Sequence, residues 1–530
     1  MDETMRYSEP LKSSPHCLPS PDGRFIATVL PSSIVIRAVD SLDIVRTVKL
    51  PPDLSGGVTA FIWSPSSRRV LVTVSDQFHV FSATEGDFHG TVRIPSSVAT
   101  KATFVDFGAT DNEACVWSSF GIKLTVINLA SSKAVEISNP KFYSALYAPK
   151  GCSFRPRTHH LALLTRTAGK DMISIHSPDA REVQRSWQPD TIDAQSLSWT
   201  PDGRWLVVCE SSAQGHRVLF YTSDGHIFRD WRGPLPHAAE DMDLQYGAGV
   251  KTLAFSPNGR HAAIANGSSC ICMLNGQSMV EEMRLRHTQT IRPNDTLQIW
   301  QEQINPPSIG SSLPTFVRAT QAVIPPGLLS NNAQEPKAGC NLVKFDSSSG
   351  LLATRLEDAP STIWIWDVST FELRAVIMYH ANVSRVEWHP VQPELLLMRC
   401  EGERYGGLVF AWDPISDGPR TIDFAHRLAG GRVNGRTHAT WLKTTATEPA
   451  AVFFTDHATC MLASLAETDG EALPWKQTHA FKQPHKGGLD FPSKSTASAE
   501  DSEDEGCSTD LDEGVSDLDD TFHFKKGQLR

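Results

Sequence analysis

Short apolar runs that follow polar turns recur along most of this chain. The run "FIATVL" at 25–30 follows the turn "SPDGR", and the run "LVVCE" at 206–210 follows "TPDGRW". Runs of this length, bounded by Gly, Pro, Ser and Asp, predict buried β-strands, because helices need roughly ten or more residues with a different period. A third short strand follows in most cases, for example "IVIRAVD" at 34–40. The pattern therefore predicts an all-β chain.

The strand pattern is an internal repeat. Clear copies are "LPSPDGRFIATVL", "IWSPSSRRVLVTV", "SWTPDGRWLVVCE" and "AFSPNGRHAAIAN". The residues that end the first strand of each of the nine copies are Pro19, Trp63, Phe107, Phe154, Trp199, Phe255, Phe345, Trp388 and Trp441. The successive spacings are 44, 44, 47, 45, 56, 90, 43 and 53 residues. A repeat of about 44 residues with four short strands is typical of a WD40-type β-propeller blade.

The repeat divides the chain into nine units within a propeller region at 1–481. We expect these units near 18–50, 61–95, 101–137, 150–184, 196–230, 250–283, 341–377, 384–422 and 438–466. They could form one irregular ring or two coupled propellers, and we favour the single ring. The segment "RYSEPLKSS" at 6–14 is expected to supply the outer strand of the last unit, which would remove an exposed sheet edge.

Two third strands end in a complete Trp-Asp pair, at 366–367 and 412–413. In "STIWIWD", alternation places Trp364 and Trp366 on one face of the strand and the two isoleucines on the other. A strand buried between blades needs apolar residues on both faces, so we interpret these tryptophans as packing residues rather than a binding platform. Because few such endings are complete, we expect the usual His-Ser-Asp-Trp hydrogen-bond network to be mostly missing.

The long spacing marks an insertion at 284–338. A structureless loop of this length is unusual in a compact domain, so the insertion either adds strands to a blade or joins two propellers. It is a candidate partner-docking region or a variable surface loop, and the sequence leaves both open. The candidate partner-binding residues are His287, Ile291, Pro293, Trp300 and Glu302.

Charge is concentrated at the C-terminal end. The formal net charge is -11, and the stretch 498–520 alone has eleven acidic residues and no Lys or Arg. The remaining chain is neutral, so we expect no nucleic-acid or membrane partner. The acidic, Ser/Thr-rich segment 482–530 is predicted to be disordered. Possible phosphorylation sites, each with an acidic residue three positions later, are Ser498, Ser502, Thr509 and Ser516.

No pattern of catalytic, cofactor-binding or metal-binding residues stands out. The chain lacks GxSxG, P-loop, HExxH and CxxC motifs, and its ten cysteines are scattered. Cys270 and Cys272 are interpreted as core thiols. No apolar run reaches the roughly 20 residues of a membrane span, and the N-terminus lacks the pattern of a signal peptide. We therefore expect an intracellular protein that is not an enzyme and binds no small-molecule substrate.

Three segments resemble one family of WD-repeat proteins. They are "YSEPLKSSPHCLPSPDGRFIA" at 7–27, "HTQTIRPNDTLQIWQE" at 287–302, and "LLATRLEDAPSTIWIWD" with the following "VEWHPVQPELLL". This pattern is similar to that of WD-repeat protein eight, a centrosomal and spindle-pole family, in a fungal-type form. The resemblance covers residues 7 to about 465. Gln301 departs from it, because the family has Lys before the glutamate.

The resemblance implies a scaffold at the spindle pole body or centrosome, in the cytoplasm and cytoskeleton. Its implied partners are a coiled-coil microtubule-anchoring protein, a minus-end-directed kinesin and other spindle-pole components. With them, such a scaffold anchors microtubule minus ends and supports mitotic spindle organisation. An alternative is a translation- or RNA-associated propeller scaffold, since wide propellers also occur there. The neutral body and the lack of a basic stripe argue against that alternative.

Overall fold

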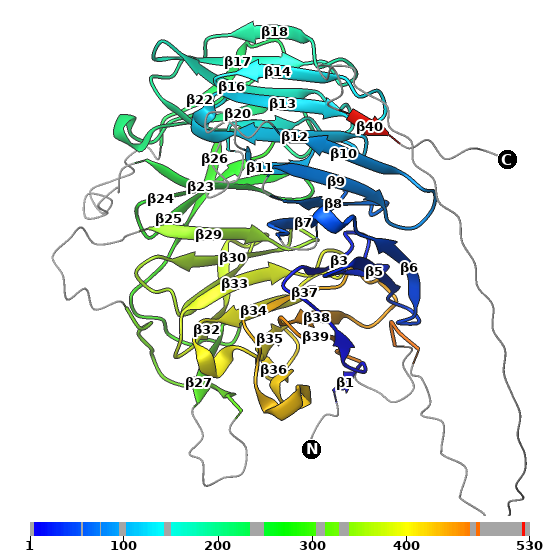
Figure 1. Ribbon diagram of the computed structural model, residues 1–530. Helices are drawn as coiled ribbons and strands as arrows, with labels where there is room; N and C mark the ends of the chain where they lie inside the picture. Colours follow the sequence, from blue (N-terminus) through cyan, green and yellow to red (C-terminus); the bar gives the residue numbers. More distant parts are fainter. Residues whose placement is uncertain are drawn as a thin grey trace, which may run out of the picture.

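The computed structural model describes residues 5–54, 57–74, 76–94, 102–141, 150–233, 249–303, 313–327, 339–466, 473–476 and 522–524. Its strands form nine sheets, which follow one another around the molecule in chain order (Figure 1). No α-helix occurs in these residues. The fold is a nine-bladed β-propeller, as the repeat predicts.

The blades are built as follows. Blade one contains β3 (Cys17–Pro19), β4 (Phe25–Leu30), β5 (Ser33–Ala38) and β6 (Ile44–Lys49), and blade two contains β7 (Ala60–Trp63), β8 (Arg69–Thr73), β9 (Gln77–Ser82) and β10 (His89–Arg93). Blade three contains β11 (Ala102–Phe107), β12 (Glu113–Ser118), β13 (Lys123–Asn128) and β14 (Ala134–Ser138), and blade four contains β15 (Cys152–Phe154), β16 (Leu161–Thr167), β17 (Lys170–His176) and β18 (Val183–Trp187). Blade five contains β19 (Ala194–Trp199), β20 (Leu206–Glu210), β21 (Val218–Tyr221) and β22 (Ile227–Trp231), and blade six contains β23 (Val250–Phe255), β24 (His261–Asn266), β25 (Cys270–Asn275) and β26 (Glu281–Arg286).

Blade seven has a core of β29 (Cys340–Phe345), β30 (Leu351–Leu356), β31 (Thr362–Asp367) and β32 (Glu372–Met378). Blade eight contains β33 (Val383–Trp388), β34 (Leu396–Cys400), β35 (Leu408–Trp412) and β36 (Arg420–Asp423), and blade nine contains β37 (His438–Trp441), β38 (Ala451–Thr455) and β39 (Thr459–Ser464). The short 3-10 helices are η1 (Pro52–Leu54), η2 (Ser119–Gly121), η4 (Ser212–Gln214), η7 (Glu403–Tyr405), η8 (Ala425–Arg427) and η9 (Ala429–Gly431).

Each pair of neighbouring blades shares a buried apolar cluster. Blades one and two meet at residues such as Ile36 and Phe61, and the remaining neighbours up to blades eight and nine meet in the same way. The last cluster joins blade nine back to blade one through Phe453 and Ile26. The nine clusters close a single ring, so the two-propeller arrangement is not formed.

The Ser-Pro-rich turn between the first two strands has a local physical basis. In blade one, the hydroxyl of Ser20 donates to Asp22 at 2.6 Å and accepts from the backbone N–H of Phe25 at 2.9 Å. Gly23 then adopts φ 77°, and a Cβ at this position would lie 2.3 Å from the carbonyl oxygen of Lys443. Only glycine satisfies both conditions here, which explains the Ser-Pro-Asp-Gly sequence.

The tryptophans that end several first strands connect neighbouring blades. The indole N–H of Trp63 donates to the carbonyl of Leu18 at 3.1 Å, and that of Trp388 donates to Lys344 at 2.8 Å. Trp441 repeats the contact by donating to the carbonyl of Glu387 at 3.1 Å. Each bond joins two first strands across a blade boundary, so the repeated aromatic position contributes to both packing and registration of the ring.

The N-terminal segment closes the ring. β1 (Arg6–Tyr7) and β2 (Leu11–Lys12) pair antiparallel with β39 and give blade nine its outer strand, beside the orange strands in Figure 1. The hydroxyls of Ser13 and Thr455 add a hydrogen bond of 2.6 Å. The predicted closing strand is therefore confirmed. At the other end of the chain, β40 (Phe522–Phe524) pairs antiparallel with β10 of blade two.

The two tryptophans of β31 are packing residues. Trp364 and Trp366 lie in the cluster between blades six and seven, whereas Ile363 and Ile365 lie in the cluster between blades seven and eight. Both indoles are buried, with 1% and 4% of their surface exposed. This confirms that the alternating strand is sandwiched between blades and offers no face to a partner.

Candidate functional site

The insertion extends blade seven. β27 (Gln298–Gln303) runs parallel to the outer strand β32, with Trp300 opposite Ile377, and β28 (Thr315–Arg318) pairs antiparallel with β27. Blade seven thus becomes a six-stranded sheet with β28 at its outer edge. Of the two possibilities left open by the sequence, the insertion adds strands to a blade.

His287 is a structural residue between blades six and seven. Its Nδ1 donates to the carbonyl of Ser269 at 2.8 Å, and its Nε2 accepts from the hydroxyl of Thr354 at 2.9 Å. Trp366 donates its indole N–H to the same hydroxyl at 2.9 Å, and the imidazole meets both β31 indoles edge-on. Burial lowers the pKa of His287 to about 4, so the ring is neutral at physiological pH.

This chain of bonds supplies three members of the His-Ser-Asp-Trp network in blade seven, which makes this blade a partial exception to the expectation that the network is mostly missing. His, a hydroxyl residue and Trp are all in place, with threonine in the position of serine. The sequence obscured the match because 67 residues separate His287 from Thr354, and the insertion fills most of that interval. A motif search that expects a blade of about 44 residues does not pair them.

Ile291, Pro293 and Trp300 also belong to the body of the protein. Ile291 is buried in the cluster between blades six and seven and forms an isolated bridge with Val323, while Pro293 is half-buried. Trp300 lies in the cluster between blades seven and eight and packs on Gly418, where a Cβ would come within 2.9 Å of the indole. These residues attach the insertion to the ring.

Glu302 connects blades seven and eight. It accepts from the phenol of Tyr405 at 2.7 Å and from the backbone N–H of His380 at 2.8 Å, and only 3% of its surface is exposed. Burial, followed by the contact with this carboxylate, raises the pKa of Tyr405. A buried carboxylate with two strong donors is a satisfied structural group.

The candidate residues of the insertion are therefore mostly buried, and the structure brings them into two internal networks rather than onto one surface. Partner binding by this region stays a prediction. The exposed apolar side chains of the insertion are not among the candidate residues. They are Val317 on β28, 53% exposed, and Ile324, 71% exposed. The phosphorylation candidates Ser498, Ser502, Thr509 and Ser516 lie outside the described residues.

A second candidate site lies where blades eight, nine and one meet. A cavity of about 940 Å³ is lined by Arg385, Arg399, Arg436 and His438, together with residues of the N-terminal segment such as Ser14 and Cys17. We call this cavity the arginine pocket. Arg385 on β33 and Arg399 on β34 are directly paired across the two strands. Like charges placed opposite each other in a sheet are destabilising, and here Arg385 is compensated by an ion pair with Glu387 at 2.8 Å.

The positive charges of the arginine pocket act on one another. Burial, followed by the charges of Arg385 and Arg436, lowers the pKa of Arg399. Burial and the three arginines together lower the pKa of His438 to about 4, which keeps this histidine neutral at physiological pH. The Nε of Arg399 is buried without a hydrogen-bond partner, although the same guanidinium donates to the carbonyl of Thr437 at 3.0 Å. Three carboxylates, those of Glu401, Glu403 and Asp456, line the same pocket, so its arginines and carboxylates are equal in number.

Sequence reasoning missed the arginine pocket, although a signal was present. Three residues before the aligned aromatic or proline of each repeat, blades one, eight and nine carry His16, Arg385 and His438. The other six blades carry Ala60, Phe104, Gly151, Ser196, Thr252 and Leu342 at that position. The cationic or imidazole side chains therefore occur only in the three blades that border the pocket. Comparing one repeat position across all blades would have revealed them.

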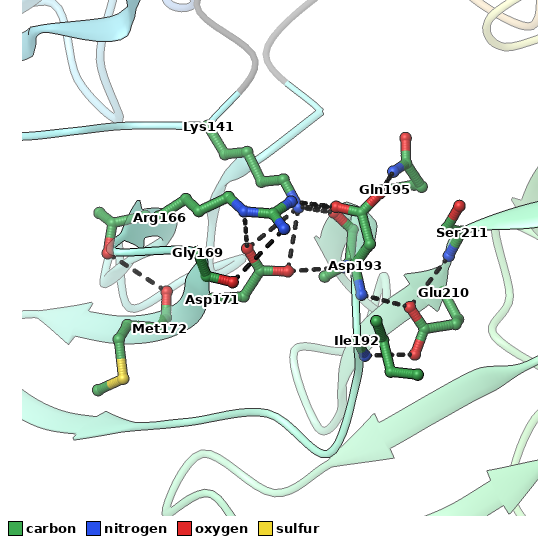
Figure 2. Close-up of polar contacts among 12 residues, drawn as sticks. Lys141, Arg166, Gly169, Asp171, Met172, Ile192, Asp193, Gln195, Glu210 and Ser211 are labelled. Carbon is green, nitrogen blue, oxygen red and sulfur yellow. Dashed lines mark hydrogen bonds and ion pairs between the residues drawn. The ribbon is translucent and has the colours of Figure 1, made fainter. Parts of the chain in front are cut away.

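A contrasting charged cluster joins blades four and five (Figure 2). The ammonium group of Lys141 donates to Asp171 at 3.0 Å and to Asp193 at 2.8 Å, and Arg166 forms ion pairs with the same two carboxylates. Burial would raise the pKa of Asp193, but the bonds and charges of Lys141 and Arg166 outweigh it and lower that pKa. We call this set the paired cluster, because its cations and carboxylates balance.

The described residues show few signs of other chemistry. Among them, no group of three or more His, Cys, Asp or Glu is arranged to hold a metal ion. The nine cysteines in this part of the chain are free thiols, and Cys270 and Cys272 are buried in the core as predicted. No helix in the described ranges is long and apolar enough to cross a membrane.

The comparisons with known proteins identify WD-repeat proteins as relatives. WD repeat-containing protein WRAP73 of Mus musculus is 24% identical over 443 residues, covering 77% of this chain and 87% of that protein. An uncharacterized WD repeat-containing protein of Schizosaccharomyces pombe is 22% identical over 398 residues, covering 73% of this chain and 75% of that protein. No model of a protein family matches the chain.

Solved structures align over much of the chain with low similarity. A structure titled as a eukaryotic initiation factor covers 77% of this chain and 87% of its own, at 10% identity and a TM-score of 0.48. A mitotic checkpoint complex chain also covers 77% of this chain, and 92% of its own, at 11% identity and a TM-score of 0.37. At these sequence identities and TM-scores, the solved structures give no indication of function.

Proposed function

We propose that the protein is a non-enzymatic scaffold at the spindle pole body or centrosome, where it helps to anchor microtubule minus ends and to organise the mitotic spindle. Support comes from WD-repeat relatives along most of the chain and from a propeller that presents a wide rigid surface to protein partners. The proposed partners are a coiled-coil microtubule-anchoring protein and a minus-end-directed kinesin.

One observation carries the proposal. Two of the three segments that resemble the spindle-pole family, 287–302 and 351–367, lie apart in the sequence yet meet at blade seven, whereas the segment 7–27 belongs to blades nine and one. His287 bonds to Thr354 and through it to Trp366, and Glu302 binds His380. These two parts of the family-like pattern thus correspond to one physical unit, a six-stranded blade held to the ring by two buried polar networks. Scattered chance similarity would not be expected to assemble in this way.

The exposed edge of this blade is the proposed docking region for a protein partner. Val317 and Ile324 are both more than half exposed, although such side chains are usually buried. β28 forms the outer edge of its sheet, and an edge strand can receive an extended peptide from another chain. Hydrophobic contacts at this edge, with strand pairing beside them, would give a partner both affinity and register.

Live imaging tests the proposed function. A fluorescently tagged copy should concentrate at spindle poles in dividing cells, and minus-end anchoring proteins should co-purify with it. The double variant Val317→Glu, Ile324→Glu should keep its melting temperature but lose the pole signal and the co-purifying partners. A control with equal charge, Val183→Glu with Ile192→Glu on blade four and its connection to blade five, changes two exposed apolar residues elsewhere and should localise normally.

A tagged wild-type protein that never concentrates at the poles would overturn the proposed function. Localisation that persists in the blade-seven double variant would instead exclude the proposed docking edge. The two outcomes are separable because the first concerns the whole protein and the second concerns only one edge.

A further inference from the structure

Two buried thiols face each other at the place where the ring closes. Cys17 lies on β3 of blade one, and Cys460 lies on β39 of blade nine. Both belong to the apolar cluster between these two blades, and their side chains are hydrogen-bonded to each other. The thiol contact therefore crosses the boundary at which the first and the last blade meet.

Strand pairing and hydroxyl groups fix the position of this contact. Cys460 lies directly opposite Thr455 in the pairing of β39 with β38. The hydroxyl of Thr455 is bonded to that of Ser13 at 2.6 Å, and Ser13 also hydrogen-bonds to both thiols. Cys17 shares a further hydrogen bond of 3.1 Å with Thr28 of its own blade. Polar groups from both sides of the blade boundary thus surround the two sulfur atoms.

The two thiols differ in acidity. Burial raises the pKa of Cys17, but the hydrogen bonds from Cys460 and from the surrounding hydroxyls outweigh burial and lower this pKa to about 7. The contact with Cys17, followed by burial, raises the pKa of Cys460 well above its ordinary value. Because the thiolate is the nucleophile in thiol chemistry, Cys17 is the reactive member of the pair and Cys460 remains a thiol.

The arginine pocket gives a small oxidant a route to this pair. Cys17 is among the residues that line this cavity of about 940 Å³. A cavity of this size admits molecules much larger than hydrogen peroxide. We propose that Cys17 and Cys460 form a redox modification site, at which a hydroperoxide oxidises the two thiols to a disulfide between blades nine and one.

The proposed reaction has two steps. The thiolate sulfur of Cys17 attacks one oxygen of hydrogen peroxide, the O–O bond breaks, and the hydroxide that leaves takes up a proton and becomes water. Cys17 is thereby oxidised to a sulfenic acid. The sulfur of Cys460 then displaces the hydroxyl group of that sulfenic acid, which leaves with the proton of Cys460 as a second water, and the S–S bond forms. Two thiols lose two electrons, and one peroxide gains them.

The disulfide would lock the closure of the ring. The pairing of β1 and β2 with β39 holds the N-terminal segment on blade nine through backbone hydrogen bonds. A covalent link between the first and the last blade removes much of the entropy that the chain gains when these blades separate. The reduced protein would therefore open at this boundary more readily than the oxidised protein.

A second pair of thiols provides an internal control. Cys115 on β12 and Cys152 on β15 also lie together across a blade boundary, the one between blades three and four. Burial raises the pKa of both thiols, and that of Cys152 rises to about 12. We expect this pair to stay reduced under conditions that oxidise Cys17 and Cys460, because neither member supplies a thiolate.

Peptide mapping of the native full-length protein tests the proposal. The protein is treated with hydrogen peroxide at pH 7, its remaining thiols are blocked before denaturation, and tryptic peptides are identified by mass spectrometry. The expected product is a disulfide that joins peptides 13–24 and 444–476, each of which contains one cysteine. Peptides 102–123 and 151–157, which contain the control thiols, should stay unlinked. The oxidised protein should melt about 3 °C higher, and dithiothreitol should reverse both changes.

Single substitutions assign the roles of the two thiols. Cys460→Ser removes the resolving thiol, so the sulfenic acid of Cys17 should persist and react with dimedone about ten-fold more than in wild type. Cys17→Ser should abolish the cross-link and leave no dimedone adduct on Cys460. The matched control Cys115→Ser should leave the yield of the cross-link within about two-fold of wild type, because Cys115 takes no part in the reaction.

Two results on the wild-type protein would overturn the proposal. Peroxide treatment that leaves the thiols of Cys17 and Cys460 unlinked would exclude the modification site. Equal formation of the link between peptides 102–123 and 151–157 would show that buried thiols react wherever they lie close together, without selection by the site. Both readings come from the unmodified sequence, so they hold even where a variant fails to fold.

Discussion

The paired cluster and the arginine pocket lie in different parts of the ring, and they differ in how their charges are arranged. Both are built from strand ends and from the connections between blades. In the paired cluster, the side chains of Asp171 and Asp193 are 1% and 32% exposed and hold Lys141 between them (Figure 2). In the arginine pocket, Arg385 faces Arg399 across two strands, and no carboxylate in the described chain pairs with the second arginine.

The difference concerns how charged side chains contribute to stability. A buried charge that is fully paired within the chain fixes the geometry of its surroundings and leaves little affinity for a ligand. Charges of one sign that remain unpaired raise the free energy of the isolated fold, and a ligand of opposite sign can recover that energy.

The largest expected effect comes from breaking the paired cluster. Asp171→Ala removes one of the two carboxylates that bind Lys141 and the acceptor of the buried backbone N–H of Ala194. We expect the free energy of unfolding to fall by about 3–5 kcal/mol. Urea denaturation followed by tryptophan fluorescence measures it.

The matched substitution in the arginine pocket is Arg399→Met, which keeps an aliphatic side chain and removes the charge. We expect a loss of about 1 kcal/mol, because relief of the repulsion from Arg385 partly offsets the two lost hydrogen bonds to the carbonyl and the hydroxyl of Thr437. Equal losses in the two variants would contradict the distinction between the clusters.

An intermediate effect concerns pH. The pKa of His438 is lowered to about 4, below its ordinary value near 6.5, so the unfolded chain binds the proton that the folded chain rejects. Stability is therefore lost as pH falls from about 6.5 towards 4. His438→Gln should reduce the loss between pH 7 and pH 5 by about 1–2 kcal/mol. Thermal melts across this range test it, with the exposed His226→Gln as the control.

The two smallest expected changes in the free energy of unfolding have opposite signs. Arg166→Gln removes a partly exposed ion-pair partner and should lower the free energy of unfolding by up to about 1 kcal/mol. Arg436→Gln removes an exposed charge among like charges and should leave stability unchanged or raise it by about 0.5 kcal/mol. Both differences should shrink in 1 M NaCl. Destabilisation by Arg436→Gln at low salt would show that this arginine has a stabilising partner after all.

Much of the fold could be predicted from local sequence. The residues Ser20-Pro21-Asp22-Gly23 predict the hydrogen bonds of their turn and the positive φ of its glycine. The alternation in β31 predicts that its residues are buried between blades. The closing segment at 6–14 could be predicted because an open last blade would leave a sheet edge exposed. These features depend on neighbours in the chain or on one general rule.

The candidate sites were harder to predict, for physical reasons. Trp300 and Glu302 were singled out as partner-binding candidates, yet the parallel pairing of β27 with β32 buries both against blade eight. His287 was separated from Thr354 by the insertion that it anchors. The exposure of a side chain and its hydrogen-bond partners depend on which strand of another repeat packs beside it. The local sequence pattern does not contain that information.

By itself, the sequence determined the repeat, the strand content and the excess of acid at the C-terminal end, because each is a property of composition or of short spacing. Tertiary structure alone decided that nine blades close one ring, that the insertion widens blade seven, and that arginines of different strands meet in a pocket. Ring closure brings together residues more than 400 positions apart, such as Ser13 and Thr455. The balance of charge at any point on the ring is set only after that closure, since each ion pair depends on side chains from separate strands and connections.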